Sequence, residues 1–224
     1  MSKTEPFEKD YDAYDAWFDE NRNVYESEIL AVRSLLPRSG RIVEIGVGSG
    51  RFASRLGIPE GVEPAVGIST LAAARGVRIL RGCAECLPLG DESCDALLYV
   101  TTLCFVDDVD LTFREASRVL KPGGCVVLAF IPKDSRFGTL YDRLKQENAF
   151  YREATFRATQ EVLAALEKAG LRLVEAVQTL TGPPETANES VETPRPGFDR
   201  GSFVVLLAGK AGKRVRAGTM NLSS

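Results

Sequence analysis

A glycine-rich turn follows the first clearly apolar segment of the chain. The segment ends at Ile45, and Gly46-x-Gly48-x-Gly50 comes directly after it. Glycine tolerates positive φ and lets the backbone approach a ligand closely, so such a turn between a strand and a helix is typical of nucleotide-like ligands. A dinucleotide fingerprint needs Gly or Ala at the sixth position, where this chain has Arg51. The turn therefore favours a nucleotide-like ligand other than NAD, although taken alone it is also compatible with a plain tight turn.

Two carboxylates accompany this turn. Glu44 lies just before it, and Glu63 follows 19 residues later in the sequence Gly61-Val-Glu-Pro64. At the predicted end of the second strand, a carboxylate can accept hydrogen bonds from both hydroxyls of a ribose. The alternative is a solvated acid in a turn. The glycine-rich turn at the appropriate distance upstream favours the ribose role.

The chain contains no histidine, which removes the commonest general base and the Ser-His and Cys-His nucleophile pairs. Any catalysis must then depend on positioning, carboxylates, tyrosines or a reactive cofactor. Five cysteines are present, and Cys83-Ala-Glu-Cys86 forms a C-x-x-C. A zinc site needs further ligands, and there is neither a histidine nor a second such pair. We therefore predict no metal and assign these thiols to packing around a binding loop.

The elements that must position these residues alternate between short β-branched runs and helical stretches, which is the pattern of βαβ units on a parallel sheet. We predict strands at 41–46, 60–65, 77–81, 94–100 and 124–131. We predict helices at 24–36, 50–56, 67–75 and 109–120. The turn 121–124, Lys-Pro-Gly-Gly, is expected to stop the last of these helices.

The pattern changes after residue 132. A charged helix is predicted at 134–148 and a second one from Thr159 to Gly170, followed by strands at 171–179 and 202–209. Between these strands, 181–200 contains four prolines and is expected to be a long irregular loop, which is typical of a lid or of disorder.

Length and composition predict one domain, 1–210, with an N-terminal helical cap (1–38), a helical insertion (133–158) and a flexible tail (211–224). The net charge of −3 gives no basic footprint, so no nucleic-acid partner is expected. The polar N-terminus lacks the apolar core of a signal peptide, and no apolar run approaches the roughly 20 residues needed to span a bilayer. We therefore expect a cytoplasmic protein without a membrane partner.

Three further motifs follow the glycine-rich turn and the Gly61–Pro64 turn along the chain. The segment 82–88, Gly-Cys-Ala-Glu-Cys-Leu-Pro, follows the third predicted strand, 91–95 (Asp-Glu-Ser-Cys-Asp) opens the fourth, and 121–124 precedes the fifth. With the two turns above, these motifs resemble, in order over about residues 40–131, the class I S-adenosylmethionine-dependent methyltransferases. The resemblance is to the methyltransferase type 11 group, similar to the ubiquinone/menaquinone C-methyltransferases. It implies a Rossmann-like α/β fold, with helices on both faces of a mostly parallel seven-stranded sheet whose last strand is antiparallel, and S-adenosylmethionine as the cofactor.

The resemblance also implies roles for individual residues. The expected cofactor-binding residues are Glu44, Gly46, Gly48, Gly50, Glu63, Ala84, Glu85 and Thr101. The expected acceptor-site residues are Tyr14, Trp17, Thr102, Phe105 and Tyr141. The chain departs from the family pattern at Cys83, where many relatives have Asp, and at Leu103-Cys104-Phe105, where others have a histidine.

The aromatic residues near the N-terminus allow two interpretations. Tyr11, Tyr14, Trp17 and Phe18 recur at spacings of three and four, as on a helix face packed against a core. A binding pocket in this architecture lies above the carboxyl ends of the strands, and the same segment is available to cover it.

Methyl transfer from a sulfonium is an in-line displacement with a good leaving group, and alignment of the acceptor supplies most of the catalysis. We therefore assign no catalytic residue. Asp107, Asp108 and Tyr141 are candidate bases, although acids at a helix start are commonly dipole partners or caps. The sequence predicts transfer to a small, partly apolar acceptor by a monomer or homodimer. Alternatives are a non-catalytic S-adenosylmethionine-binding protein, or an NAD-dependent oxidoreductase or aminopropyl transferase on a similar scaffold.

Overall fold

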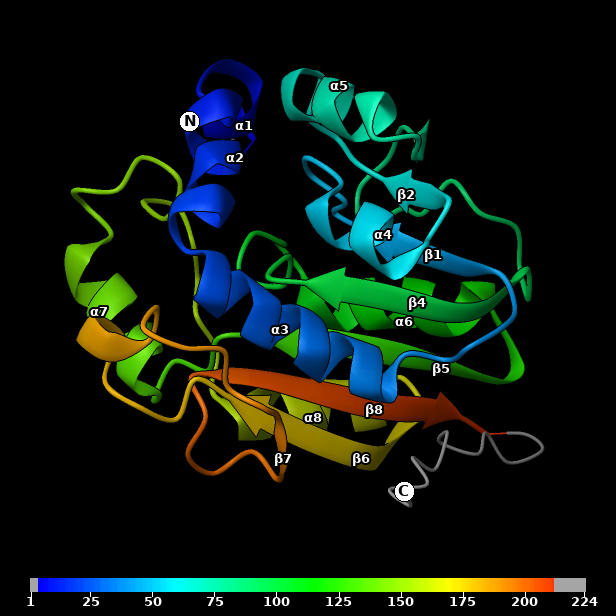
Figure 1. Cartoon of the computed structure of the whole chain (residues 1–224). Coiled ribbons are helices and arrows are strands. Elements are labelled where there is room, and N and C mark those ends of the chain that lie inside the picture. The colour runs from blue at the N-terminus through cyan, green and yellow to red at the C-terminus, as the bar shows by residue number, and fades with distance from the viewer. Residues whose placement is uncertain (1–3, 212–224) are drawn as a thin grey trace, which may run out of the picture.

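The computed structural model describes residues 4–211, in which one sheet of eight strands lies between helices on both faces (Figure 1). The strand order is β3-β2-β1-β4-β5-β8-β6-β7. The strands are β1 (Ile42–Ile45), β2 (Glu60–Val62), β3 (Arg78–Leu80), β4 (Cys94–Val100), β5 (Leu120–Phe130), β6 (Leu171–Thr179), β7 (Arg195–Pro196) and β8 (Phe203–Lys210).

The first five strands are parallel. β1 pairs with β2 on one side and β4 on the other, and β4 pairs with β5. Each residue of β1 is buried, because helices cover both faces of a parallel sheet and its strands become nearly continuous apolar runs. Glu44 is the polar exception in β1. The carboxyl ends of these strands meet at one edge of the sheet, which confirms the expected architecture.

The last long strand, β8, is inserted antiparallel between β5 and β6, as the resemblance implied. The predicted count of seven strands was one too low, because β7 pairs with β6 inside the segment 181–200 that was expected to be irregular. The Gln178 side chain holds this segment in place. Its Nε2 donates to the Pro196 carbonyl (3.2 Å) and the Asp199 carboxylate (2.8 Å), and its Oε1 accepts from the N–H groups of Arg200 and Gly201.

The helices are α1 (Glu5–Lys9), α2 (Tyr11–Glu20), α3 (Arg22–Leu35), α4 (Arg51–Leu56), α5 (Val66–Ala74), α6 (Val109–Val119), α7 (Arg136–Leu144) and α8 (Thr159–Lys168), with a 3-10 turn at Pro184–Thr186. Helices lie on both faces of the sheet (Figure 1). Alternate residues of the strands pack against opposite helix layers. Leu98 belongs to the core that contains Ile29 of α3, whereas Leu97 and Tyr99 belong to the core that contains Phe113 of α6. The protein is therefore a three-layer α/β structure.

Two predicted boundaries need correction. The turn 121–124 does not separate α6 from the next strand, because β5 already begins at Leu120, which pairs with Cys94 before the register shifts. The helix predicted at 134–148 is shorter, since α7 begins at Arg136, where the Ser135 hydroxyl accepts a hydrogen bond from the Gly138 N–H, and ends at Leu144. Apart from Ala211, the predicted tail 211–224 lies outside the described residues.

The helices α1 to α3 fall within the segment predicted as a cap, and α7 falls within the predicted insertion. In Figure 1, α1, α2 and α7 lie toward the carboxyl ends of the parallel strands. No helix among residues 4–211 combines the length and apolar character that crossing a membrane requires.

Candidate functional site

A cavity of about 380 Å³ lies at the carboxyl ends of β1, β2 and β4. Its volume is within the range of small-molecule binding pockets, about 300–1,000 Å³. Its walls come from the glycine turn, the ends of these strands, the loop after β3, and α1 and α2. The lining residues are Thr4, Phe7, Tyr14, Gly46, Gly48, Val62, Glu63, Pro64, Ile68, Gly82, Cys83, Ala84, Glu85, Val100, Thr101, Thr102, Phe105, Val106, Asp107 and Glu153.

The glycine turn forms one wall of this cavity through its backbone. Gly46, Gly48 and Gly50 have φ values of 70°, 53° and 77°, which side chains disfavour. A Cβ at Gly46 would lie 2.4 Å from Thr102 Cγ2, and one at Gly50 would lie 2.8 Å from Ala72. Gly46 and Gly48 line the cavity, whereas Gly50 lies outside its lining and allows α4 and α5 to pack closely.

Glu63 lies at the end of β2 with its carboxylate at the cavity wall. Its Oε2 accepts a hydrogen bond from the Gly48 N–H (2.9 Å), and its Oε1 accepts one from the Ala65 N–H (3.0 Å). Burial raises the pKa of Glu63, and these two bonds oppose that effect. A carboxylate has about four acceptor sites, so two remain for a ligand. The geometry therefore fits a carboxylate that binds a diol and also fixes the glycine turn.

Glu44, by contrast, lies beneath the turn and does not line the cavity. It is 2% exposed, accepts a hydrogen bond from the Ala53 N–H in the first turn of α4, and its Oε2 has no partner. Burial raises the pKa of this carboxyl well above its ordinary value. In this structure Glu44 supports the start of α4.

The loop after β3 forms the opposite wall, with Ala84 and Glu85 both at the cavity. The Glu85 Oε1 accepts a hydrogen bond from the Asp107 N–H (2.7 Å), which ties this loop to the segment that follows β4. Cys83 and Cys86 form a short backbone bridge in the same loop, and both are free thiols. Among residues 4–211, no group of three or more acids, cysteines or histidines could hold a metal ion.

Two threonines follow β4. The Thr102 hydroxyl donates to the carbonyls of Ile45 (2.9 Å) and Val100 (3.1 Å), which fixes the ends of β1 and β4 relative to one another. Thr101 has φ of 50°, an unusual conformation for a β-branched residue, and such outliers concentrate at functional sites. Thr101 lines the large cavity and also a second, smaller one.

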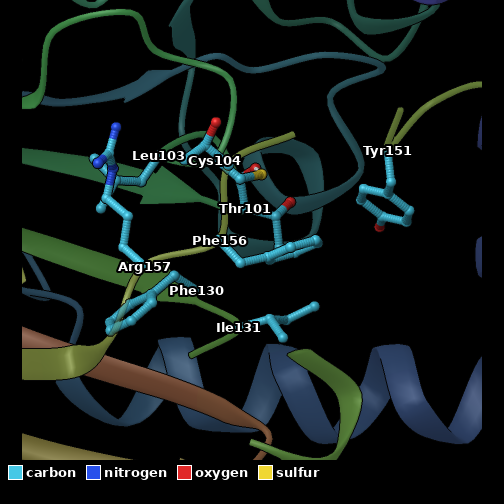
Figure 2. A pocket seen from close by; sticks show the side chains of 9 residues that line it. Thr101, Leu103, Cys104, Phe130, Ile131, Tyr151, Phe156 and Arg157 are labelled. Carbon is cyan, nitrogen blue, oxygen red and sulfur yellow. Dashed lines mark hydrogen bonds between the residues drawn. The ribbon is translucent and has the colours of Figure 1, made fainter. Parts of the chain in front are cut away.

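The second cavity measures only about 10 Å³ and is mainly apolar (Figure 2). It lies between the ends of β4 and β5 and the segment that precedes α8. Its lining residues are Thr101, Leu103, Cys104, Phe130, Ile131, Tyr151, Thr155, Phe156 and Arg157. The Tyr151 ring stacks against Tyr141 with centroids 5.0 Å apart and against Phe105 at 6.4 Å.

The helices α1 and α2 cover the large cavity and are held there by acidic side chains. Glu8 of α1 accepts hydrogen bonds from the N–H groups of Val66 (2.8 Å) and Gly67 (2.6 Å) at the start of α5. A Cβ at Gly67 would lie 2.6 Å from the Glu8 carbonyl oxygen, so the glycine also permits the close approach of the two helices.

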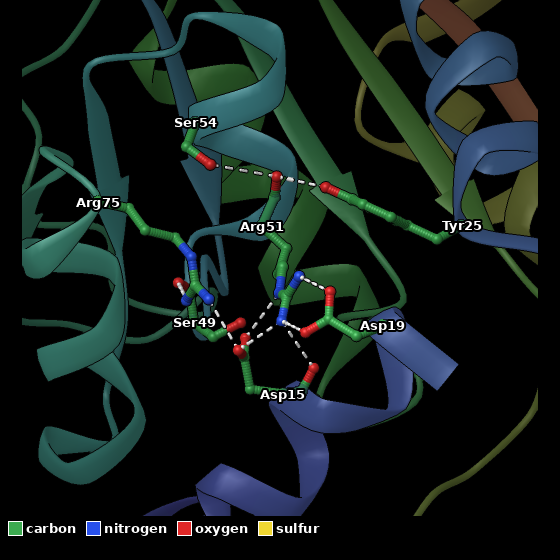
Figure 3. Close-up of polar contacts among 7 residues, drawn as sticks. All are labelled: Asp15, Asp19, Tyr25, Ser49, Arg51, Ser54 and Arg75. Atoms are coloured by element: carbon green, nitrogen blue, oxygen red, sulfur yellow. Dashed lines mark hydrogen bonds and ion pairs between the residues drawn. The ribbon is translucent and has the colours of Figure 1, made fainter. Parts of the chain in front are cut away.

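Arg51 is central to the attachment of α2 (Figure 3). Its Nη2 lies 2.7 Å from the Asp15 carboxylate and 2.6 Å from the Asp19 carboxylate, while Arg75 bonds both Asp15 (2.7 Å) and the Ser49 carbonyl (2.7 Å). Burial alone would raise the pKa of Asp15, but hydrogen bonds led by that from Arg51 lower it to about 2. Arg51, the residue whose position in the sequence disfavours NAD, thus connects the glycine turn to α2.

The predicted acceptor residues are only partly gathered at the large cavity. Tyr14, Thr102 and Phe105 line it. Trp17 instead packs edge-on against Phe18 (5.3 Å), and Tyr141 lies behind Tyr151. Of the other candidate bases, Asp107 lines the cavity. Asp108 is the N-cap of α6, and its Oδ1 accepts a hydrogen bond from the Leu111 N–H (2.8 Å).

Several lining residues were not predicted from the sequence. Phe7 contacts the rings of Tyr14 (5.3 Å) and Phe105 (5.2 Å) and so extends the aromatic cover. Its position shortly before the aromatic series of α2 was the available signal. Pro64 and Ile68 line the cavity because they follow Glu63 in the sequence and lead into α5. Glu153 comes from the predicted insertion, and nothing in the sequence indicated that it would line the cavity.

Comparisons with known proteins identify the family of the chain. A family model described as a methyltransferase domain matches residues 43–128. A crystal structure of a SAM-dependent methyltransferase and possible histamine N-methyltransferase from Thermotoga maritima is 42% identical, with a TM-score of 0.88 over 93% of this chain and 99% of that one. An uncharacterised protein of Methanocaldococcus jannaschii is 37% identical over 204 residues, 91% of this chain and 98% of its own.

A demethylmenaquinone methyltransferase of Roseiflexus castenholzii is 37% identical over 101 residues, which are 40% of this chain and 42% of the relative. The chain belongs to the class I S-adenosylmethionine-dependent methyltransferases. It is an enzyme of that family, with S-adenosylmethionine as its cofactor, and the family predicted from the five motifs is confirmed.

Proposed function

We propose that the enzyme transfers a methyl group in line from S-adenosylmethionine to a small-molecule acceptor, with the two partners in direct contact beside Thr101. The single observation that carries this proposal is the position of Thr101, which lines both the large cavity and the small apolar one. A transfer in line needs the acceptor atom about 3–3.5 Å from the methyl carbon, so the spaces for donor and acceptor must meet, and Thr101 borders both.

The large cavity has the features that the cofactor requires. Glu63 has free acceptor sites for the ribose hydroxyls, the turn at Gly46 and Gly48 offers backbone to the amino-acid part, and Ala84 with Glu85 would flank the adenine. When bound, the cofactor supplies an activated methyl group on a sulfonium. Glu44 and Gly50 would act from behind this wall, by supporting the turn and the start of α4.

The remaining contribution of the chain is alignment and exclusion of water. The rings of Phe7, Tyr14 and Phe105 cover the cavity, and acidic residues of α1 and α2 fix this cover to α4 and α5. Because the leaving group is good, positioning at Thr101 accounts for the reaction without a histidine. The single domain at 1–210 and the monomer or homodimer remain predictions, as does the cytoplasmic location.

Calorimetry with S-adenosylmethionine, S-adenosylhomocysteine and NAD tests the cofactor site. We expect binding of the first two and none of NAD; binding of NAD alone would contradict the proposal. A screen of metabolites for methyl transfer tests the acceptor side and separates an enzyme of small molecules from a non-catalytic binding protein. Histamine belongs in that screen because the similar Thermotoga maritima protein is a possible histamine N-methyltransferase.

A further inference from the structure

Arg157 is the one charged residue among the described residues that line the small cavity next to Thr101 (Figure 2). It belongs to the segment before α8 and is partly buried. Its Nε is shielded from solvent and has no hydrogen-bond partner within residues 4–211, and in the same part of the chain its side chain makes no ion pair. A buried charged donor without a partner is costly and needs an explanation.

Other arginines around the cofactor cavity have such partners. Arg51 bonds the Asp15 carboxylate (2.7 Å), and Arg81 donates to the Ser69 hydroxyl (2.7 Å). An arginine whose stem only covers apolar surface keeps its polar end in water, whereas the Nε of Arg157 is buried. The described part of the chain therefore leaves donors of this guanidinium unused beside the small cavity.

The two cavities that share Thr101 carry opposite charge. The charged residues that line the large cavity are all acids, and among the described residues no lysine or arginine joins them: Glu63, Glu85, Asp107 and Glu153. This lining suits a cofactor with a cationic sulfonium. The small cavity has only the Arg157 guanidinium, which stays protonated at neutral pH. Complementary charge therefore favours a cationic donor on one side and an anionic acceptor on the other.

We infer that Arg157 binds the acceptor, and that the acceptor is a carboxylic acid with an apolar body whose carboxylate receives the methyl group. This inference rests on the proposed function. A guanidinium can bind a carboxylate through two parallel N–H···O bonds. Leu103, Phe130 and Ile131 give the same cavity apolar walls for a hydrocarbon body. An ammonium group would be repelled by the guanidinium, and a neutral acceptor would leave its charge unpaired.

The size of the small cavity indicates which part of the acceptor it receives. A volume of about 10 Å³ is room for about one water molecule, and hence for one carboxylate oxygen. Because Arg157 and Thr101 border the same small space, an oxygen held there by the guanidinium lies beside the wall shared with the cofactor cavity. The hydrocarbon body needs more room, so the segment of Tyr151 and Phe156 must move outward when the acceptor enters.

A carboxylate acceptor needs no base, which suits a chain without histidine. A carboxylic acid is already ionised at neutral pH, so no proton has to be removed. A lone pair of the carboxylate oxygen forms the new O–C bond to the methyl group while the S–C bond breaks, and the sulfur retains the electron pair. The products are S-adenosylhomocysteine and a neutral methyl ester, which binds the guanidinium more weakly than the acid does and therefore leaves readily.

The test uses three compounds with one carbon skeleton: phenylacetate, which is anionic, phenethyl alcohol, which is neutral, and phenethylamine, which is cationic. Benzoate and hexanoate extend the acids to other shapes. Binding to the full chain saturated with S-adenosylhomocysteine is measured by calorimetry at pH 7. Methyl transfer from S-adenosylmethionine is measured as methanol released by alkali, which hydrolyses methyl esters but not N-methyl groups or methyl ethers.

Three variants accompany the compounds. Arg157→Met removes the charge and keeps a long unbranched side chain, whereas Arg157→Lys keeps the charge without the planar fork. Arg152→Met is the matched control, because Arg152 is an exposed arginine of the same segment that lines neither cavity.

We expect at least one acid to bind and to yield methyl groups that alkali releases as methanol, and the alcohol and the amine to do neither. Arg157→Met is expected to lose at least tenfold in affinity for the acid, and Arg157→Lys to lose less. The affinity for S-adenosylhomocysteine should not change, because Arg157 does not line the cofactor cavity. Arg152→Met should behave as the unmodified enzyme.

The inference is overturned if no acid binds, if the alcohol or the amine binds better than every acid, if the transferred methyl group resists alkali, or if Arg157→Met binds the acid unchanged. If Arg157→Met does not fold, Arg157→Lys and the compound series decide. Failure of the proposed function is a different result, namely loss of S-adenosylhomocysteine binding in the unmodified enzyme. Normal cofactor binding with indifference to acids would therefore reject the carboxylate acceptor alone.

Discussion

The two sides of Thr101 are built by different means. The cofactor side is largely backbone: three glycines with positive φ, the ends of parallel strands, and carboxylates such as Glu63 that are bonded to backbone N–H groups. The other side is made of side chains. The rings of Phe105, Tyr141 and Phe156, from three separate segments, pack around Tyr151.

This difference explains what each side tolerates. A backbone wall is determined by positions where only glycine fits, so a single Cβ disturbs it. A wall of rings can be repacked, and its specificity depends on the few polar groups it encloses. We therefore expect steric changes to damage the cofactor side and changes of charge to alter the acceptor side.

The largest expected effect is the pH dependence conferred by Glu28. This carboxyl of α3 is buried, and burial raises its pKa to about 8 in the folded protein, above its ordinary value of 4.5, so the folded state holds a proton that the unfolded state loses. Stability from this group is complete below pH 4.5 and is lost as the pH rises to about 8, by about 1.4 kcal/mol for each pH unit. Thermal unfolding of Glu28→Gln across this range should show its stability rising relative to the unmodified chain. A constant difference from pH 5 to 8 would contradict the assignment.

Gly46→Ala tests the backbone wall sterically. The new Cβ would lie 2.4 Å from Thr102 Cγ2 at a φ of 70°, and we expect a loss of about 2–4 kcal/mol in the free energy of unfolding. Gly57→Ala is the matched control, because φ is 73° there and nothing lies within 4 Å of the added atom. Urea unfolding of both variants separates crowding from backbone strain. Equal losses of stability in the two variants would mean that the Thr102 side chain moves aside at no cost.

Glu63→Ala tests the carboxylate assigned to the ribose. Loss of charged hydrogen bonds should weaken binding of S-adenosylhomocysteine by about 1–3 kcal/mol, as measured by calorimetry. Glu60→Ala in the same strand is the control, since Glu60 pairs with Arg41 and Arg78 away from the cavity. Unchanged affinity in Glu63→Ala would remove the ribose assignment.

Arg51→Ala is expected to give the smallest of these effects. It tests the ion pairs that attach α2 to the start of α4. Arg75 still pairs with Asp15 in this variant, so we expect a stability loss of about 1–2 kcal/mol and faster release of S-adenosylhomocysteine. Arg55→Ala breaks the more exposed pair with Glu26 and should cost less than about 1 kcal/mol. Stopped-flow release rates that are equal in both variants would show that α2 does not control the cofactor.

The sequence was most informative where function depends on local backbone geometry. The glycine turn and Glu63 could be placed because strand, turn and helix follow one another within one βαβ unit. The fold could be predicted from the same alternation of strands and helices. Arg51 was noticed only for what it excluded, since its partners Asp15 and Asp19 lie more than 30 residues away in the sequence.

The acceptor side was less predictable because its parts come from distant segments. Tyr151 contacts the rings of Phe105 and Tyr141 only in the folded chain, and no sequence spacing indicates those contacts. Trp17 shares the pattern of Tyr14 but does not line the cavity, because helical spacing cannot tell a lining residue from a packing one.

The insertion of β8 between β5 and β6 has a consequence for synthesis of the protein. Residues 203–210 are made after both of their neighbours, and β8 pairs with Val126 and Leu128 on one side and with Ala176 on the other. Until these residues leave the ribosome, β5 has an unpaired edge and β6 has only the two-residue strand β7 beside it. The strands β1 to β5 can therefore pair before β8 is synthesised. During that interval the apolar edge of β5 is exposed to other chains and to chaperones.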